Sequence, residues 1–598
     1  MSENNINHEL VEVNEDSDAQ IYSDVQGGQP SLDKTEPDVI IDSDTKNAIR
    51  SSLIQLGFIN FDSSSADNSS SEAMVSAEHR KHFRRDVYVG IKDVEQNLDF
   101  LGRVVEGPFH APHEIGTDSA ITRTTVLHPD RTQFRPTYYV TGTIEILGQL
   151  VDNERLVPTP TRPRPYSEIY IFPPERLQKF LKISGEFYLG QLMGYEKVKV
   201  LADINLKNFL PRNVGIFGTV GSGKSNTTQV LMEEAVKAGW AVVVVDVEGE
   251  YVKMNQPTSD NNLIPLLKEK YDIEPEGISD FKVYVPHSGD TDADNPIRFK
   301  VPASEMDPYV LSDLMELTEP QARLFEGIMR KLKNENDERR QSENVRLGPL
   351  INPQNQTGSD PSRLFSFQDI IVKASDTKFC KDLGAVGGTD IALRAKLIRL
   401  GRYNMLDWNA NKDTQELPVD ELLVDGRLSV LDVSETDDRS RNIAIAYTLQ
   451  SLFDKVIQYS VGEKMANGKP RPKVLVVIEE VHTFVSRSNA TKMRSVLDNM
   501  QVISRRGRKR WMSLALVSQQ PGHVPDELFE LANTRFIHQL KSTSNLAPVK
   551  QTTGGVHEAL WSNIPSLGPG QCLVTGAIFN NPLFVEIRPA KTKRMLTN

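Results

Sequence analysis

Eight short apolar runs follow one another between residues 213 and 576, and stretches with helical periodicity separate them. The runs are NVGIFG, AVVVVD, FKVYVP, LSVLDVS, VLVVIE, LALVSQ, RFIHQL and QCLVTG. Strands that are apolar on both faces are typical of a mostly parallel sheet, because helices cover both sides of such a sheet. The pattern predicts an α/β domain over residues 201–598, with a mainly helical insertion at about 303–425.

Two different sequence textures precede this domain. Residues 85–200 contain short alternating runs such as VYVGI, TYYVTGTIEIL and EIYIF, separated by Pro, Gly and Asp, and these predict a small β barrel. Residues 1–84 are rich in Asp, Asn, Ser and Glu and lack sustained apolar periodicity, so we expect a disordered acidic tail. Within that tail, LIQLGF at residues 53–58 is an alternative candidate for a short docking element.

The negative charge of the chain is concentrated in this first segment. The net charge is −12, and residues 1–75 alone hold 15 Asp and Glu against 3 Lys and Arg. The rest of the chain therefore holds 66 acidic residues (81 minus 15) and 66 basic residues (69 minus 3). Because residues 76–598 are neutral as a whole, the overall acidity does not exclude nucleic-acid binding.

Cysteine content and hydropathy exclude several classes of protein. Cys380 and Cys572 are the only cysteines and neither lies in a CxxC or Cys/His cluster, which argues against a disulfide framework or a zinc site. No apolar stretch approaches the roughly 20 residues that span a bilayer, and the first residues lack the basic start and apolar core of a secretory signal. We therefore expect no membrane association and a cytoplasmic protein.

The run NVGIFG leads into GTVGSGKS at residues 218–225, which matches the pattern G-x-x-x-x-G-K-[ST] and precedes a helical stretch. Glycines let such a loop curl so that its N–H groups and the helix N-terminus point at phosphates. Lys224 is expected to reach the β- and γ-phosphates, and Ser225 to ligate Mg²⁺. The predicted nucleotide-binding residues are Gly218, Thr219, Val220, Gly221, Ser222, Gly223, Lys224, Ser225 and Asn226.

The run VLVVIEEVHTF ends in two adjacent carboxylates, Glu479 and Glu480. Successive side chains of a strand point to opposite faces, so the two glutamates need not share a role. We expect Glu479 to hold the Mg²⁺ shell, through water, and Glu480 to orient or deprotonate the water that attacks the γ-phosphate. Two solvated glutamates at a strand end are the alternative interpretation.

A third set of candidates surrounds the run LALVSQ. Gln519 ends this run and is the predicted γ-phosphate sensor. SRRGRKRW precedes it and contains Arg505 and Arg508. Arg508, with Arg505 as second choice, is the candidate arginine finger that enters a neighbouring subunit's ATP site, an effect of about 10³–10⁵ in rate in other NTPases. Phosphate contacts to DNA and a solvated basic helix end are the alternatives.

These stretches resemble, in the same order, the motifs of HerA-type DNA-translocating ATPases, which are relatives of FtsK. The similar segments are GTVGSGKSN, DVEGEY, VLVVIEEVHTF, SRRGRKRWMSLALVSQQP and LGPGQCLVTG, with FLGRVVEG and TYYVTGTIEILG in the preceding barrel. The resemblance implies a RecA-like P-loop ATPase core and a homo-hexameric ring with ATP at subunit interfaces and double-stranded DNA in its centre. Two motifs depart from the family pattern: Glu479 replaces the usual Asp, and DVEGEY replaces DxHGEY.

The resemblance also implies partners. We expect an ATP- and Mg²⁺-dependent DNA translocase that acts with a nuclease, as in NurA-type DNA end resection, or with a sirtuin-like or other effector in anti-phage defence. The alternative is an ATPase scaffold that assembles an effector enzyme without processive DNA translocation. Stimulation of ATP hydrolysis by duplex DNA distinguishes these two hypotheses.

Overall fold

The computed structural model describes most of the chain from residue 54 onward. The described residues are 54–61, 69–112, 137–152, 155–204, 209–347, 365–408, 415–483, 485–488 and 494–595, together with Ala120, Arg123 and Leu127. Residues 1–53, where the acidic tail is predicted, lie outside them. In the described part of the chain, no helix is long and apolar enough to cross a membrane.

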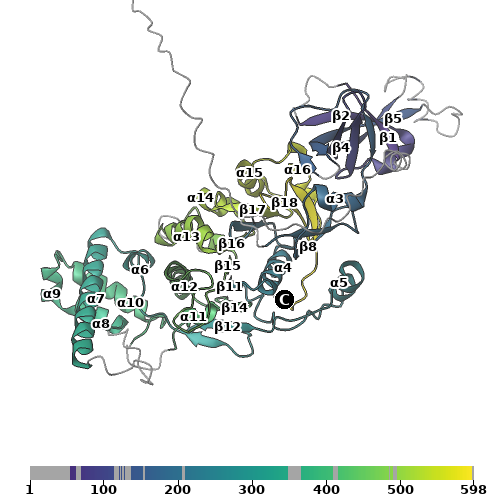
Figure 1. Ribbon diagram of the computed structural model, residues 1–598. Coiled ribbons are helices and arrows are strands. Elements are labelled where there is room, and N and C mark those ends of the chain that lie inside the picture. The colour runs from purple at the N-terminus through teal and green to yellow at the C-terminus, as the bar shows by residue number, and fades with distance from the viewer. Residues whose placement is uncertain are drawn as a thin grey trace, which may run out of the picture. The chain divides into compact units, whose positions relative to one another are not determined.

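The N-terminal part of the described chain is an antiparallel β barrel (Figure 1). Its sheet has the order β2-β1-β7-β3-β4-β5-β6, and a further pairing of β2 with β5 closes six strands into a barrel. Apolar side chains from these strands fill the interior, among them Leu56, Val89, Phe100 and Ile144. The strands are β1 (Gln55–Ile59), β2 (Ser70–Ser76), β3 (Tyr88–Asp93), β4 (Leu98–Pro112), β5 (Tyr138–Val151), β6 (Arg155–Val157) and β7 (Glu168–Ile171).

Both predicted boundaries of the barrel are wrong. The predicted tail, residues 1–84, includes strands β1 and β2 and the 3₁₀ helix η1 (Ala77–His82). Leu56 and Val75 are buried there although the surrounding composition is polar, because the two strands pair with each other and with β7 and β5. At the other end, β8 (Phe187–Leu192) and β9 (Lys199–Ala202) belong to the second sheet, since β8 pairs with β19.

The second sheet has twelve strands in the order β13-β12-β14-β11-β15-β16-β10-β17-β18-β19-β8-β9. It is parallel from β13 to β17 and antiparallel beyond. Its remaining strands are β10 (Asn213–Phe217), β11 (Ala241–Asp246), β12 (Phe281–Pro286), β13 (Ile297–Phe299), β14 (Leu428–Asp432), β15 (Val474–Ile478), β16 (Met512–Ser518), β17 (Ala532–Ile537), β18 (Gln571–Thr575) and β19 (Leu583–Ile587).

The central strands of this sheet are buried on both faces, as their composition predicts. Along β15, Val476 and Ile478 belong to one apolar cluster, and Leu475 and Val477 belong to another on the opposite face. The helices of the domain are α3 (Pro174–Phe180), α4 (Lys224–Lys237), α5 (Leu263–Tyr271), α12 (Asp438–Gln458), α13 (Arg494–Gly507), α14 (Asp526–Phe529), α15 (Thr543–Gln551) and α16 (Glu558–Trp561). The α/β class is therefore the observed one.

Among the residues described between β13 and β14 there are six α-helices, and α6 to α10 gather into one group (Figure 1). They are α6 (Pro308–Leu314), α7 (Glu319–Leu347), α8 (Phe367–Ser375), α9 (Thr377–Asp382), α10 (Thr389–Gly401) and α11 (Val419–Leu422). Phe325 of α7 and Leu393 of α10 are fully buried and join the apolar cluster that covers one face of the sheet. This helical segment occupies the place of the predicted insertion.

Candidate active site

The carboxyl ends of the parallel strands β10, β16, β15 and β11 meet at one edge of the sheet. β10 leads there into the loop 218–223, and helix α4 begins at Lys224. Gly221 and Gly223 have φ angles of +74° and +102°, a left-handed conformation that glycine adopts without strain. A Cβ at Gly223 would also lie 2.6 Å from the backbone nitrogen of Gly570. The glycines of the motif are thus required by the shape of the loop.

The side chains of Thr219 and Ser222 hold the loop in shape. The Thr219 N–H and hydroxyl both donate to the Gln539 carbonyl, at 2.9 and 3.1 Å, and the Ser222 hydroxyl donates to the Thr219 carbonyl at 2.7 Å. Val220, at the tip, is exposed. Helix N-termini favour anions, so the start of α4 is placed to receive phosphate beside this preformed loop.

A buried histidine supports α4 from behind. His538 lies on the segment after β17, and its Nε2 is 2.9 Å from the Thr227 hydroxyl while its Nδ1 is 3.0 Å from the Gln571 carbonyl. Burial, assisted by the nearby Lys224 charge, lowers the pKa of His538 to about 3. The ring is therefore neutral, with Nδ1–H donating to the carbonyl and Nε2 accepting from the hydroxyl.

Lys224 and Glu480 face each other across the site. The Lys224 Nζ is 3.8 Å from the Glu480 Oε1, and both side chains are about 95% buried. Burial lowers the pKa of Lys224, and the charges of Glu480 and Glu479 oppose that effect. The structure thus brings together the lysine of the loop and the predicted catalytic glutamate.

Glu480 is held by the end of β16. Its Oε2 accepts a hydrogen bond from the Gln519 N–H at 3.0 Å and is 3.1 Å from the Nδ1 of His482. Burial raises the pKa of Glu480, but the hydrogen bond from His482, the Lys224 charge and the Gln519 N–H together bring it below its ordinary value. An ionised carboxylate is the form that accepts a proton from water.

Glu479 points to the other side, toward the loop after β11. Its Oε1 accepts a 2.7 Å hydrogen bond from the Tyr251 hydroxyl, and its Oε2 is buried without a hydrogen-bond partner among the described residues. Burial, followed by the charges of Asp246 and Glu250, raises the pKa of Glu479 well above its usual range. A cation beside this carboxyl would reverse that effect.

The loop after β11 is organised by Asp246. Its two oxygens accept hydrogen bonds from the N–H groups of Gly249, Glu250 and Tyr251, at 2.8, 3.2 and 2.8 Å. Burial, followed by the Asp432 charge, raises the pKa of Asp246 to about 7. Asp246 therefore shapes the DVEGEY turn, a role that the sequence left open.

The donor set at this edge fits a magnesium ion held mainly by a nucleotide. Mg²⁺ keeps several waters and binds through one or two protein oxygens and the substrate phosphates. The half-buried Ser225 at the start of α4 and the unpartnered Glu479 Oε2 supply such oxygens. The described residues contain no group of three His, Cys, Asp or Glu side chains that would hold a metal by itself.

Gln519 joins the two carboxylate groups. Its N–H binds Glu480, and its side-chain Nε2 donates to the Glu248 Oε1 at a longer distance of 3.4 Å. Gln519 follows β16 directly, so a movement of this strand end would reach both carboxylates. The structure thus places the predicted sensor beside Glu480.

Arg505 and Arg508 do not join this site within one chain. They lie on α13 and on the 3₁₀ helix η4 (Arg508–Arg510), directly before β16, and both are exposed. Because β16 runs parallel to β10, this position is at the amino edge of the sheet, opposite the loop 218–223. Arg508 lies near Arg212, whose pKa is lowered by burial and then by the Arg508 charge.

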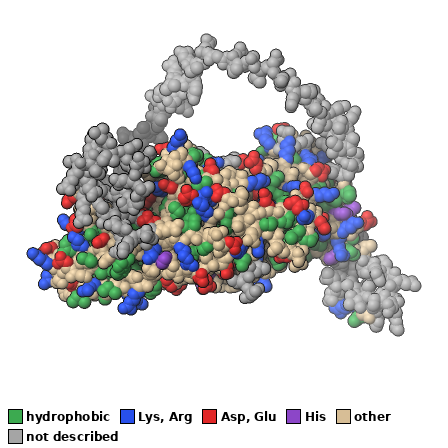
Figure 2. Space-filling view, turned by 90° about the horizontal axis from the view of Figure 1, so that it is seen from below, with side chains coloured by type: hydrophobic (Ala, Val, Ile, Leu, Met, Phe, Trp, Pro, Cys, Tyr) green, Lys and Arg blue, Asp and Glu red, His purple; other side chains and the backbone are tan. Residues whose placement is uncertain are grey.

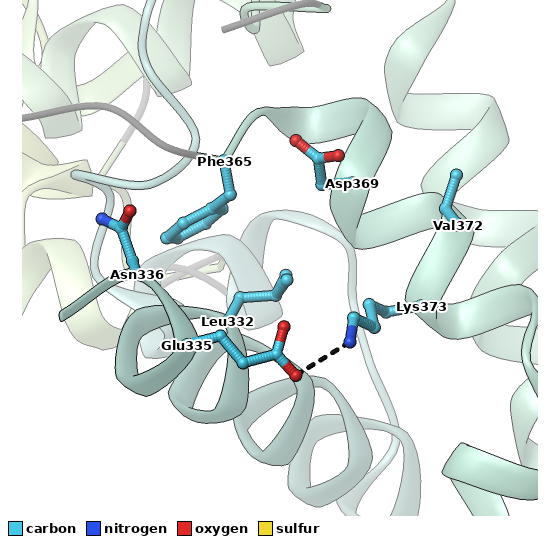
Figure 3. A pocket seen from close by; sticks show the side chains of 7 residues that line it. All are labelled: Leu332, Glu335, Asn336, Phe365, Asp369, Val372 and Lys373. Carbon is cyan, nitrogen blue, oxygen red and sulfur yellow. Dashed lines mark hydrogen bonds and ion pairs between the residues drawn. The ribbon is translucent and has the colours of Figure 1, made fainter. Parts of the chain in front are cut away.

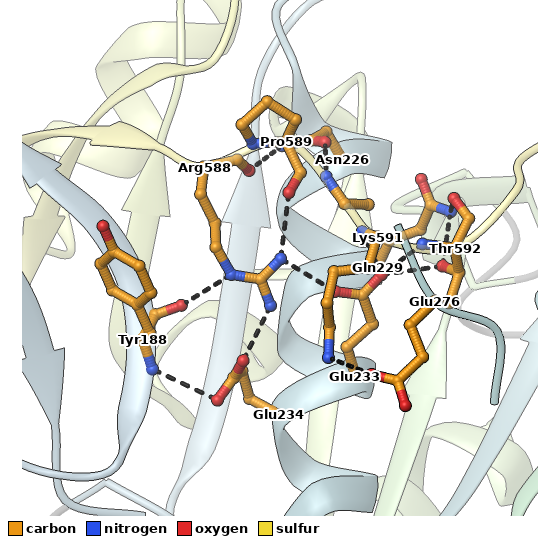
Figure 4. Close-up of polar contacts among 11 residues, drawn as sticks. Tyr188, Asn226, Gln229, Glu233, Glu234, Glu276, Arg588, Pro589, Lys591 and Thr592 are labelled. Atoms are coloured by element: carbon orange, nitrogen blue, oxygen red, sulfur yellow. Dashed lines mark hydrogen bonds and ion pairs between the residues drawn. The ribbon is translucent and has the colours of Figure 1, made fainter. Parts of the chain in front are cut away.

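Asn226 is also placed differently from the prediction. Its side-chain amide donates to the Arg588 carbonyl at 2.8 Å and its oxygen accepts from the Ala590 N–H at 2.8 Å (Figure 4). The side chain thus ties α4 to the end of the chain, and these two hydrogen bonds engage both of its polar atoms.

The cavity in Figure 3 is separate from these residues and belongs to the helical insertion. It has a volume of about 130 Å³, and an ion pair of 2.9 Å between Lys373 and Glu335 closes one side. Its lining consists of Leu332, Glu335, Asn336, Phe365, Asp369, Val372 and Lys373. None of the predicted site residues takes part.

Known proteins similar to this chain include several HerA helicases. Residues 187–452 match the family model described as the central domain of helicase HerA, and the match begins where β8 begins. The DNA double-strand break repair helicase HerA of Pyrococcus furiosus is 23% identical over 481 residues, covering 76% of this chain and 78% of the relative. The HerA of Saccharolobus solfataricus is 23% identical and covers 69% of this chain and 70% of the relative.

These comparisons support a HerA/FtsK-type ATPase. The resemblance inferred from the motifs is thereby confirmed, and the protein is a P-loop NTPase that hydrolyses ATP. Among solved structures, VirB4 of Thermoanaerobacter pseudethanolicus is similar, with 13% identity, a TM-score of 0.44, and coverage of 68% of this chain and 97% of that one.

Sequence reasoning missed several residues of this site. His482 lies two residues after Glu480, and its Nδ1 is 3.1 Å from both the Glu480 Oε2 and the Ser518 hydroxyl. Its proximity to the glutamate pair was a usable signal. Tyr251 was visible inside DVEGEY, but nothing local indicated that it binds Glu479, 228 residues away.

Replacing Tyr251 with Phe is expected to destabilise this ATPase by about 1–3 kcal/mol, because the buried Glu479 Oε1 loses its donor. The measurement is the shift of the urea unfolding midpoint. Tyr284→Phe is the matched control, since its fully buried hydroxyl has no hydrogen-bond partner among the described residues. Equal shifts in the two variants would contradict a stabilising role for the Tyr251–Glu479 bond.

Proposed function

We propose that this HerA/FtsK-type ATPase is an ATP- and Mg²⁺-dependent motor that moves double-stranded DNA as a homo-hexameric ring. The observation that carries the proposal is the convergence of Lys224, Glu480 and Gln519 at one edge of the sheet. The Lys224 Nζ is 3.8 Å from the Glu480 Oε1, and the Gln519 N–H is 3.0 Å from the Glu480 Oε2. The similarity to relatives named DNA double-strand break repair helicases supports DNA as the substrate. A nuclease or a sirtuin-like effector is the proposed partner, in DNA end processing or anti-phage defence.

In this proposal Glu480 accepts the proton of the water that attacks the γ-phosphate. The loop amides and Lys224 hold the phosphates, and Lys224 stabilises the charge that develops on them. Mg²⁺, held by Ser225 and by Glu479 through water, would supply further neutralisation of the β- and γ-phosphate oxygens. Gln519 keeps Glu480 in place through its N–H at 3.0 Å.

The position of Arg508 and Arg505 supports a ring. A finger that serves a neighbouring subunit must lie on the surface and away from the loop of its own chain, and both arginines are exposed at the opposite sheet edge. Head-to-tail contacts that close by rotation generate rings with one such site at every interface. In such a ring ATP lies between subunits.

The charges outside the acidic first segment balance, so DNA contact in this proposal depends on a small number of basic residues. The face in Figure 2 carries basic and acidic side chains interspersed, and residues 76–598 are neutral as a whole. A pore that neutralises several phosphates releases counterions, so binding weakens steeply as salt increases. The exposed Arg506, beside the two finger candidates, is a candidate source of such contacts.

Duplex DNA is expected to stimulate ATP hydrolysis by the full-length oligomer. The test compares the ATPase rate with and without linear double-stranded DNA, at two or more salt concentrations, with the Lys224→Ala variant as the control for contaminating ATPases. Stimulation that weakens with salt would support the motor. A rate that duplex DNA leaves unchanged would favour the ATPase scaffold instead.

A further inference from the structure

The last described segment of the chain, residues 588–595, packs along helix α4 (Figure 4). We call it the C-terminal segment. Arg588 is fully buried and forms ion pairs with Glu233 at 2.9 Å and Glu234 at 2.8 Å. Glu233 also accepts hydrogen bonds from the N–H groups of Lys591 and Thr592, at 2.8 and 2.9 Å. Removing one partner of a buried ion pair is strongly destabilising, so this attachment is firm.

The same segment holds the first turn of α4. Asn226 directly follows Ser225 and bonds the backbone of Arg588 and Ala590 through both ends of its amide. The start of α4 is where phosphate is expected to bind. The C-terminal segment is therefore a support of the phosphate site and lies beside it.

Beyond α4 the C-terminal segment reaches the DVEGEY turn. The Lys593 N–H donates to the Gln256 carbonyl at 2.8 Å, and the Met595 N–H donates to the Glu250 carbonyl at 2.9 Å. Arg594 lies between these two anchors, and its Nη1 is 3.9 Å from the Glu250 Oε2. Figure 1 shows the last described residues, in yellow, between α4 and α5.

The contact between Arg594 and Glu250 is incomplete. At 3.9 Å the two groups are not hydrogen-bonded, and the Arg594 side chain is 30% exposed. The Glu250 Oε2 is buried without a hydrogen-bond partner among the described residues. The Arg594 guanidinium therefore lies next to Glu250 without donating a hydrogen bond to it. Its backbone is held on both sides by the hydrogen bonds of Lys593 and Met595.

The negative charge of the site indicates a function for the Arg594 guanidinium. The charges of Glu480, Glu479, Glu248 and Glu250 all raise the pKa of Lys224, and Glu480 lies 3.8 Å from its Nζ. A triphosphate entering this site brings further negative charge, which cations must offset. Arginine binds phosphate oxygens through up to five N–H donors in a planar fork.

We propose that Arg594 is a phosphate-binding residue supplied by the same chain that carries the loop 218–223, and that it contacts the γ-phosphate of ATP. The proposal rests on the nucleotide site described above and is independent of DNA translocation. Its position beside the DVEGEY turn places Arg594 on the side of Glu479, where the metal and the γ-phosphate are proposed to lie. The contact therefore distinguishes ATP from ADP.

The test measures equilibrium binding of fluorescent ATP and ADP analogues to the full-length oligomer with MgCl₂. We expect Arg594→Ala to weaken ATP binding about 10- to 100-fold, the size of a lost charge-assisted hydrogen bond, and ADP binding far less. Arg594→Lys should recover part of the loss. The melting temperature should stay unchanged, because a partly exposed ion pair contributes little to stability.

Lys593→Ala is the matched control, since it removes a neighbouring cation that donates to the Gln256 side chain at 3.2 Å. It should leave both affinities within about twofold, as surface substitutions usually do. Equal losses in the Arg594 and Lys593 variants, or unchanged ATP affinity in Arg594→Ala, would overturn the proposal. Failure of the unaltered protein to bind ATP would instead overturn the nucleotide site itself.

Discussion

Replacing Glu480 with Gln lowers the rate of ATP hydrolysis by about 10²- to 10⁴-fold, the usual contribution of a general base, while ATP still binds. Glutamine has the same length and keeps an acceptor for the Gln519 N–H, so the end of β16 stays in place. It cannot take a proton from water. Stopped turnover with retained nucleotide binding is therefore the expected signature.

Lys224→Ala is the companion variant, because it removes the cation that holds phosphate. It should lose nucleotide binding and turnover together, whereas Glu480→Gln loses turnover alone. Measuring both properties in both variants separates the two roles. Should Glu480→Gln hydrolyse ATP at the full rate, the base would have to be another carboxylate, and Glu248, whose Oε1 is 3.4 Å from the Gln519 side chain, would be tested next.

The parts of the site that could be predicted from the sequence are those with local causes. The loop 218–223 needs glycine at positions with positive φ, and the glycine spacing of the motif shows this requirement in the sequence. Strand alternation predicts separate directions for Glu479 and Glu480, and the structure has them, although both residues come after the end of β15 at Ile478. Glu480 itself turns with a φ of +42°, which the sequence does not announce.

The supporting contacts could not be predicted, because they join distant parts of the chain. Arg588 pairs with Glu233 across 355 residues, and Thr227 binds His538 across 311. No spacing rule relates such positions. Sequence reasoning consequently assigned Asn226 to the nucleotide alone and missed the C-terminal segment to which its side chain is bonded.

The domain boundaries failed for a related reason. β1 and β2 are short strands inside a stretch rich in Ser and Asp, and composition alone favours a tail there. Pairing with β7 and β5 supplies the missing stabilisation. β8 lies inside the range predicted for the barrel, and only its pairing with β19, nearly 400 residues later, assigns it to the ATPase sheet.

Replacing Arg508 with Ala is expected to lower ATP hydrolysis by about 10³- to 10⁵-fold, as loss of an arginine finger does in other NTPases. The backbone that carries it is firmly held: Arg471 donates to the Arg510 carbonyl and, at 2.8 Å, to the Tyr459 carbonyl. Lys509→Ala is the control, because it removes an adjacent exposed cation from the same 3₁₀ helix. It should keep most of the activity.

Mixing two inactive variants then shows whether Arg508 acts on a neighbouring subunit. The ring is assembled by co-expression of Arg508→Ala and Glu480→Gln subunits. A site is intact where an Arg508→Ala subunit supplies the loop and Glu480, and a neighbouring Glu480→Gln subunit supplies Arg508. Random mixing makes about one interface in four intact, so activity should return to a measurable fraction of the normal rate. An arginine that served its own chain would leave every site defective. A mixed ring without activity would therefore remove the finger role of Arg508, whereas recovery requires that Arg508 completes a site on another subunit.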